Sequence, residues 1–230
     1  MRRYISKEQK IEETRRFFQK VYGWMFLGLI ISGLTAYITY LNPVIYRFIL
    51  FNFYIFLGLL FLEVAFVFGL VFLYKRISPN TAIFLFLIYS FVTGLTLSVI
   101  FLVYTIDSIS LTFFIAASMF GLMSIYGFYT KTDLTGIGHV LIMGLFGIVI
   151  ASFSNLFLMN EELDYVVSFV GVIVFTGLTA YDTQKIKKRN IFGNEGTPED
   201  IKESIIGALD LYLDFVNLFL KLLRFTGKKR

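Results

Sequence analysis

The chain has 230 residues, of which 57% are hydrophobic and only 16% charged, whereas a soluble domain is ordinarily about 45–50% apolar and about 25% charged. The absence of cysteine excludes disulfides, thiolate zinc sites and thiol nucleophiles, and one histidine makes a His-based metal cluster or a Ser-His-Asp triad a poor interpretation. Most of the 21 Lys and Arg residues behind the net charge of +5 lie in three clusters, a pattern typical of loops beside a membrane, and we expect no nucleic-acid partner.

The first 20 residues form a charged segment that contains seven of the Lys and Arg residues. This segment has no short apolar core of its own, so it is not read as a signal peptide. Phe17 and Phe18 lie beside Arg15 and Arg16. We therefore expect residues 1–20 to be retained as an amphipathic helix on the membrane surface.

Seven apolar stretches meet, or nearly meet, the length of about 20 residues that a membrane-spanning helix needs. They are Val21–Tyr40, Phe51–Tyr74, Thr81–Tyr104, Leu111–Tyr129, Ile137–Met159, Tyr165–Tyr181 and Ile205–Leu223. Their separators are short and contain turn residues, such as Asn42-Pro43 and Ser78-Pro79-Asn80. The predicted fold is an all-α integral membrane protein, with a seven-helix domain over residues 21–225 and a basic tail over 226–230.

The longest connection, from Gln184 to Ser204, is basic and then glycine-containing. Within it Thr197 has the chemistry of a helix N-cap, Pro198 suits the first helical position, and two acids follow. We expect the last helix to begin near Pro198, in water, and to enter the membrane near Ile205.

The distribution of Lys and Arg predicts a cytoplasmic N-terminus. With the N-terminus inside, the inner segments (residues 1–20, 75–80, 130–136 and 184–204) carry 7, 2, 1 and 5 cations, and the outer loops (41–50, 105–110 and 160–164) carry 1, 0 and 0. The basic tail contradicts this count, because seven crossings place it outside. Either the tail keeps its charges there, or the last segment dips into the membrane and returns.

Several charged residues lie inside the apolar segments, where a charge costs at least about 2.5–3.5 kcal/mol. Glu63 lies near the middle of the second segment and Asp182 closes the sixth. Five polar residues in the seventh are spaced 0, 4, 7, 11 and 14 along the helix, namely Asp210, Asp214, Asn217, Lys221 and Arg224. At about 100° per residue they share one face, which we expect to be turned toward the interior of the bundle.

Asp182 and Asp214 come within reach of each other if the sixth and seventh helices are neighbours. Two carboxylates in a water-poor interior do not both ionise cheaply, so they titrate as a unit and sense protons. When ionised, the same oxygens suit Ca²⁺. The alternative is structural: the buried polar groups form ion pairs and hydrogen bonds that fix helix packing.

Two segments together resemble a known family. Gly177–Ile186 (GLTAYDTQKI) and Ala208–Phe219 (ALDLYLDFVNLF) are similar to the signature of the Bax inhibitor 1 family, also called the transmembrane Bax-inhibitor-motif family, in its bacterial branch. The resemblance extends over essentially the whole chain in helix number and loop length.

The resemblance implies a seven-helix fold with the last helix central and a pH-sensitive calcium leak. It places the paired aspartates at Asp182 and Asp214, and it matches a second-helix acid with Glu63 and a seventh-helix arginine with Arg224. Bacterial relatives can carry a basic latch at the inner end of the second helix. Tyr74 stands there in this chain, so Lys75 or Arg76 would have to substitute.

Three functions follow from these patterns. The first is a proton-gated Ca²⁺ leak in the bacterial inner membrane, with Asp182 and Asp214 as the ion site, supported by Glu63, Asp210, Asn217 and Arg224. The second is a non-conducting regulator that binds another membrane protein, such as a quality-control protease, through residues 2–20. The third is a calcium–proton exchanger. We expect no enzyme activity and no cofactor, because no Gly-x-Ser-x-Gly motif and no phosphate-binding glycine loop occurs.

Overall fold

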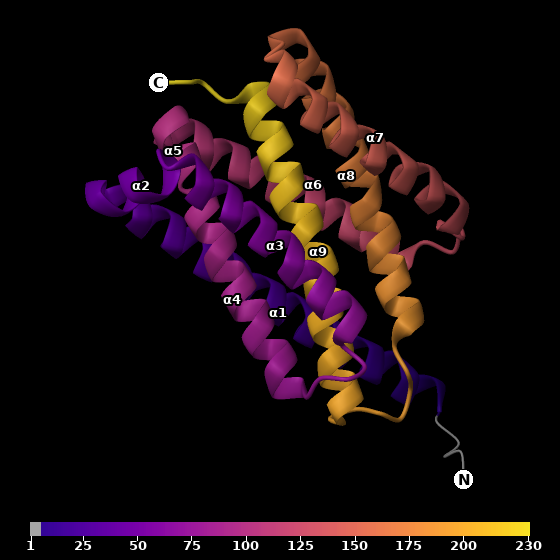
Figure 1. The fold of residues 1–230 in the computed structure, drawn as a ribbon. Coiled ribbons are helices and arrows are strands. Elements are labelled where there is room, and N and C mark those ends of the chain that lie inside the picture. Colours follow the sequence, from indigo (N-terminus) through magenta and orange to yellow (C-terminus); the bar gives the residue numbers. More distant parts are fainter. Residues whose placement is uncertain (1–5) are drawn as a thin grey trace. The chain divides into compact units, whose positions relative to one another are not determined.

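The structure is a computed structural model that describes residues 6–230, and helices dominate this part of the chain (Figure 1). The helices are α1 (Lys7–Leu41), α2 (Pro43–Leu50), α3 (Phe53–Leu73), α4 (Pro79–Leu97), α5 (Val99–Val103), α6 (Ile106–Tyr129), α7 (Thr135–Leu158), α8 (Glu161–Arg189) and α9 (Pro198–Thr226). The predicted all-α class is confirmed.

Helix α1 joins the charged N-terminal segment to the first apolar segment. Ser6 caps it in a reciprocal capping box with Gln9, and the helix then runs for 35 residues without a break. Its length of about 52 Å exceeds the bilayer core of about 30 Å. Residues 7–20 are therefore helical as predicted, but they extend the first span and are not an element of their own. Residues 1–5 of the predicted segment lie outside the described residues.

Side-chain caps set the helix boundaries that differ from prediction. Asn42 caps the short helix α2, which was not predicted, and Asn52 caps α3. The third apolar segment is divided at Ser98, so that α4 and α5 replace one continuous helix. The last helix begins at Pro198 as predicted, because Thr197 Oγ1 accepts a hydrogen bond from the backbone N of Asp200 at 3.3 Å.

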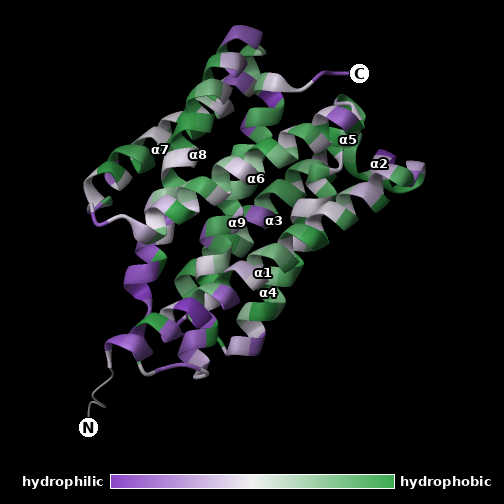
Figure 2. Ribbon diagram, turned by 180° about the vertical axis from the view of Figure 1, so that it is seen from behind, coloured by the Kyte–Doolittle hydropathy of each residue, from purple (hydrophilic) through white to green (hydrophobic). Residues whose placement is uncertain are grey.

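Six helical segments of the described chain are long and apolar enough to cross a membrane. They correspond to the first six predicted spans, and Figure 2 shows hydrophobic residues over most of the length of α3, α4, α6 and α7. The seventh predicted span, α9, has 29 residues, which at 1.5 Å per residue is about 43 Å. Helix α9 is not one of the six apolar segments, because it contains more polar and charged residues than they do.

The chain divides into two compact units, and α9 contributes to both. The first contains the residues up to Val103 together with Arg189–Tyr212. Within it α1 and α3 both pack on α4. Gly28 on α1 lies against the ring of Phe86, and the Tyr212 hydroxyl is 2.6 Å from Ser32 Oγ. Small and hydroxyl side chains thus let these helices approach closely.

The second unit contains Tyr104–Lys188 and Leu213–Arg230. Phe215 on α9 stacks edge-to-face on Phe113 and Phe120 of α6. The close approach of α6 to α8 depends on Gly127, where a Cβ atom would collide with the backbone of Ala180. These contacts hold α6, α8 and the second half of α9 together.

Helix α9 is buried along most of its length. No residue from Ile201 to Leu223 is exposed, and Leu209, Leu211 and Leu218 have no accessible surface. A helix that is buried all round faces protein on every side. The polar residues of α9 between Ile201 and Leu223 are therefore placed among other side chains.

The end of α9 lies in the second unit beside two loops that were predicted to be on the same side of the membrane. The backbone N of Thr105 donates to the carbonyl of Lys228 at 3.2 Å, and Lys228 N donates to Ser108 Oγ at 3.0 Å. Arg224 pairs with Asp164 in the other loop region. The tail is thus at the same end of this unit as both loops.

Candidate functional site

Asp214 is the most enclosed of the predicted site acids. The residue is 5% exposed and lies on α9 in the second unit. A carboxylate this deeply buried on a membrane helix is expensive unless a proton, a cation or a hydrogen-bond donor stabilises it. Asp214 is enclosed by the protein, and its role as an ion or proton site stays a prediction.

Asp182 lies on α8 in the same unit and has a cation beside it. Its Oδ1 atom is 2.8 Å from Nζ of Lys185, one helical turn away, and its side chain is 13% exposed. Lys185 was not predicted as a site residue, although its i,i+3 spacing is the sequence signal for such a pair. The local counter-charge of Asp182 therefore comes from its own helix.

The helices that carry Asp182 and Asp214 pack against each other where α8 begins and α9 ends. A Cβ atom at Gly171 of α8 would press on the Lys221 side chain of α9, and the ring of Tyr165 on α8 contacts that of Phe225 on α9. Residue numbers rise on α8 as they fall on α9, so the two helices are antiparallel. Neighbouring antiparallel helices are the arrangement that the predicted aspartate pair requires.

Asp210, a predicted supporting residue, belongs to the first unit. Its Oδ2 atom is 3.1 Å from a guanidinium nitrogen of Arg189, the last residue of α8. Arg189 was not predicted, and its position in the basic run 185–189 was the only sequence signal. Asp210 thus has a surface cation as a partner, with its side chain 17% exposed.

Glu63 also lies in the first unit, where its partner is a hydroxyl group. Thr96 Oγ1 on α4 is 2.6 Å from Glu63 Oε1. Thr96 was not predicted, because a threonine in an apolar helix has many structural uses. A supporting role for Glu63 in an ion path stays a prediction.

Each remaining polar residue predicted on α9 has a hydrogen-bond partner, either on α9 itself or on α7 or α8. Asn217 Nδ2 donates to the carbonyl of Leu213 at 2.8 Å, which keeps this side chain on its own helix. Lys221 Nζ is 3.4 Å from Ser152 Oγ on α7. Arg224 is 2.7 Å from Asp164 Oδ1, with both side chains well exposed. The polar face predicted for α9 therefore contains two buried or half-buried acids and, near its end, an accessible ion pair.

Lys75 and Arg76, the candidates for a basic latch, follow α3 in the first unit and are exposed. Lys75 Nζ lies 5.8 Å from the ring centroid of Tyr74. This cation–π contact holds Lys75 beside its own helix end. A latch role for Lys75 or Arg76 stays a prediction.

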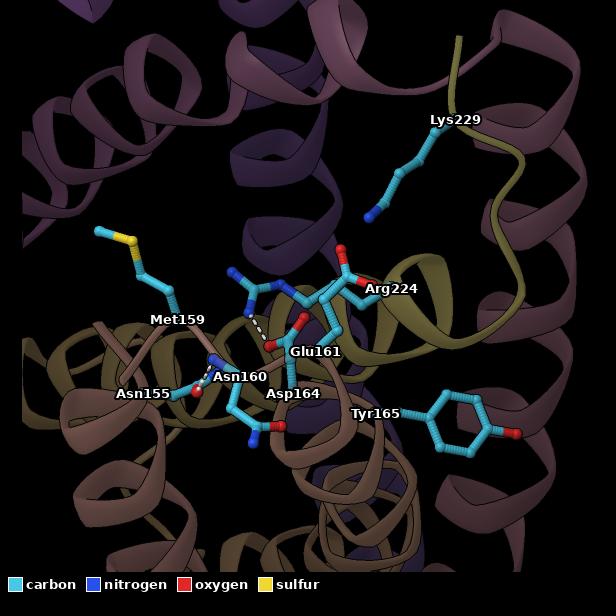
Figure 3. Close-up of a pocket in the computed structure, with 8 residues that line it drawn as sticks. All are labelled: Asn155, Met159, Asn160, Glu161, Asp164, Tyr165, Arg224 and Lys229. Carbon is cyan, nitrogen blue, oxygen red and sulfur yellow. Dashed lines mark hydrogen bonds and ion pairs between the residues drawn. The ribbon is translucent and has the colours of Figure 1, made fainter. Parts of the chain in front are cut away.

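A polar cavity of about 370 Å³ opens at the end of the second unit that carries the C-terminal tail (Figure 3), and we call it the distal cavity. It is lined by Asn155, Met159, Asn160, Glu161, Asp164, Tyr165, Arg224 and Lys229. Asn155 Oδ1 caps the backbone N of Asn160 at 2.9 Å, and Met159 adopts a left-handed conformation with φ 49°. This turn between α7 and α8 brings the acids Glu161 and Asp164 to an opening whose cations, Arg224 and Lys229, come from the end of α9 and the tail.

Within residues 6–230, no three His, Cys, Asp or Glu side chains gather in a group that could hold a metal ion. A resident calcium site usually needs six to eight oxygen ligands. Ca²⁺ binding by Asp182 and Asp214 stays a prediction.

Comparisons with known proteins agree with the two motifs at Gly177–Ile186 and Ala208–Phe219. Residues 14–230 match the family described as "Inhibitor of apoptosis-promoting Bax1". A protein of Borreliella burgdorferi is 45% identical, with 98% of this chain and 97% of the relative aligned. The inner membrane protein YbhL of Escherichia coli K12 is 45% identical over 93% of this chain and 92% of its own. A membrane protein of Streptococcus pyogenes is 36% identical over 99% of both chains.

Proposed function

Since the chain belongs to the Bax inhibitor family of membrane proteins, we propose that it provides a calcium leak pathway whose opening depends on protonation of Asp182 and Asp214. Ca²⁺ is the transported ion and not a resident cofactor. The relative from Escherichia coli is called an inner membrane protein, and we propose the same membrane for this chain. No catalytic chemistry is needed for this role.

In the proposed topology the chain crosses the membrane seven times from a cytoplasmic N-terminus. Helix α9 is the seventh span and the central helix. The cation count of the loops supports this orientation. The position of the tail beside Thr105 and Ser108 supports an odd number of crossings.

The observation that carries the proposal is the burial of Asp214, at 5% exposure, in the unit that also holds Asp182. In a low-dielectric interior an acid is tolerated when a proton or a cation neutralises it. Protonated aspartates do not attract Ca²⁺, and ionised ones do. Flux through a path lined by Asp182 and Asp214 then depends on pH, and Lys185 competes with Ca²⁺ for the Asp182 carboxylate.

The test is Ca²⁺ flux into proteoliposomes at several pH values, with wild type, Asp182→Asn and Asp214→Asn. Each variant is expected to change the flux and to flatten its pH dependence. Asp107→Asn is the matched control, because Asp107 is an exposed acid in the first turn of α6. Wild-type flux and wild-type pH dependence in both site variants would remove the proposal.

Flux measurements in the same vesicles distinguish the leak from the two alternative functions, a calcium–proton exchanger and a non-conducting regulator. A calcium–proton exchanger responds to an imposed pH gradient at constant internal pH, whereas a leak responds only to pH itself. A non-conducting regulator shows no flux above empty vesicles. In that case a deletion of residues 2–20 that loses a co-purifying membrane protein would support docking through the N-terminal segment.

A further inference from the structure

The distal cavity carries both signs of charge and is electrically balanced. Glu161 and Asp164 contribute −2, and Arg224 and Lys229 contribute +2, so the formal sum is zero. Arg224 and Asp164 already pair at 2.7 Å. The cavity therefore has a fixed ion pair and one further group of each sign.

Glu161 and Lys229 are the further groups. Among residues 6–230 neither makes an ion pair within 4 Å. Figure 3 shows the ammonium group of Lys229 and the carboxylate of Glu161 turned toward the same space, and the Arg224 guanidinium turned toward Asp164. An acid and two cations around one opening can bind a ligand that itself carries a positive and a negative group.

The surroundings of the cavity are those of a membrane interface. Phe157 at the end of α7 is 76% exposed, and Val166 near the start of α8 is 55% exposed. Tyr165 lines the cavity with its ring partly exposed, and tyrosine favours the headgroup level of a bilayer. A ligand in the cavity therefore lies next to surface that acyl chains can cover.

We propose that this cavity binds the headgroup of a zwitterionic phospholipid with a primary amine, such as phosphatidylethanolamine. The lipid phosphate accepts hydrogen bonds from Lys229 and Arg224, and the lipid ammonium donates to Glu161. The acyl chains run along the exposed apolar side chains of α7 and α8. Charge-assisted hydrogen bonds to both ends of the headgroup make the site selective.

The geometry also defines which lipids bind poorly. Phosphatidylcholine has no N–H to donate to Glu161, and phosphatidylglycerol has no cation, so it leaves the Glu161 carboxylate unpaired beside its phosphate. An unpaired partner of this kind weakens binding by more than the loss of one contact. We expect roughly tenfold weaker binding of both lipids.

The experiment titrates the detergent-purified full chain with each of the three lipids and counts bound molecules by native mass spectrometry. Glu161→Gln removes the negative charge, so binding of phosphatidylglycerol is expected to rise to or above that of phosphatidylethanolamine. Lys229→Gln is expected to weaken both. Glu162→Gln and Lys228→Gln are matched controls, because these exposed neighbours do not line the cavity.

Equal binding of the three lipids by wild type would overturn the proposal, as would an unchanged order of preference in Glu161→Gln. Water-soluble glycerophosphoethanolamine is added as a competitor. If this competitor displaces the lipid at equal concentration, the free headgroup binds as well as the whole lipid, and the proposal of a membrane phospholipid as the ligand is wrong. Thermal melting of every variant in parallel identifies loss of folding.

Discussion

Lys20 and Asp200 form an ion pair across 180 residues of sequence, with 2.5 Å between Nζ and Oδ2. Asp200 is 2% exposed and also accepts from the backbone N of Gly196 at 2.9 Å. The backbone N of Gly193 in the same connection donates to Glu13 at 2.8 Å. The connection between α8 and α9 is therefore fastened to the N-terminal half of α1.

Replacing Lys20 with Gln is expected to destabilise the protein, because it leaves the buried Asp200 carboxylate with fewer partners. The cost should be about 1–3 kcal/mol, the range for removing one partner of a buried polar group. The measurement is thermal or denaturant unfolding of the purified protein in detergent. Arg16→Gln is the control, since its pair with Glu195 has side chains 52% and 36% exposed, and exposed pairs contribute at most about 1 kcal/mol. Equal effects would contradict the argument.

Glu203 is expected to make stability depend on pH. Burial, and next the neighbouring Asp200 carboxylate, raise the pKa of Glu203, while Arg189 lowers it less. Because the pKa is higher in the folded than in the unfolded protein, the favourable contribution is present in acid and is lost as pH rises through the folded pKa. Glu203→Gln should therefore raise the melting temperature at pH 8 more than at pH 5. A gain that is the same at both pH values would refute this.

Gly127 is expected to tolerate no side chain. A methyl group there meets the backbone of Ala180, which cannot swing away as a side chain can. Gly127→Ala should cost about 1–3 kcal/mol through overpacking of α6 against α8. Gly121→Ala, in the same helix, has nothing within 4 Å of the new Cβ and should be neutral or stabilising by up to about 1 kcal/mol. Unfolding in detergent distinguishes the two, and similar values would count against the close contact.

Lys185 is expected to limit the proposed flux. Its ammonium group lies 2.8 Å from the Asp182 carboxylate and competes there with Ca²⁺. Lys185→Gln removes this competitor, so Ca²⁺ flux into proteoliposomes at a fixed pH should rise. Lys188→Gln is the control, because Lys188 pairs with the exposed Asp133. Unchanged flux in Lys185→Gln would separate this lysine from the ion path.

Much of the fold could be predicted from residues alone. The six apolar helical segments match the first six predicted spans, and the start of α9 at Pro198 follows from the Thr197 cap. Helix α2 and the break at Ser98 were not predictable from hydropathy, because the flanking residues are as apolar as those of a span. The continuity of α1 through residue 20 was missed for the opposite reason, since charged residues form helices as readily as apolar ones.

The candidate site was only partly predictable. Burial of Asp214 followed from its position on the polar face of a long helix, whereas the partners of Glu63, Asp210 and Arg224 did not. Thr96, Arg189 and Asp164 lie 33, 21 and 60 residues away from them. No periodicity in the sequence connects residues at such separations.

The sequence by itself determined that this protein lies in a membrane and where its six long apolar helical segments lie. Both depend on local properties, because each membrane helix satisfies its backbone hydrogen bonds internally and needs only a run of apolar residues. The tertiary structure decided which charges meet: Lys20 with Asp200, Arg224 with Asp164, and the opposed groups at the distal cavity. Such pairings depend on the rotation and neighbours of whole helices, which are set by packing between segments far apart in the chain.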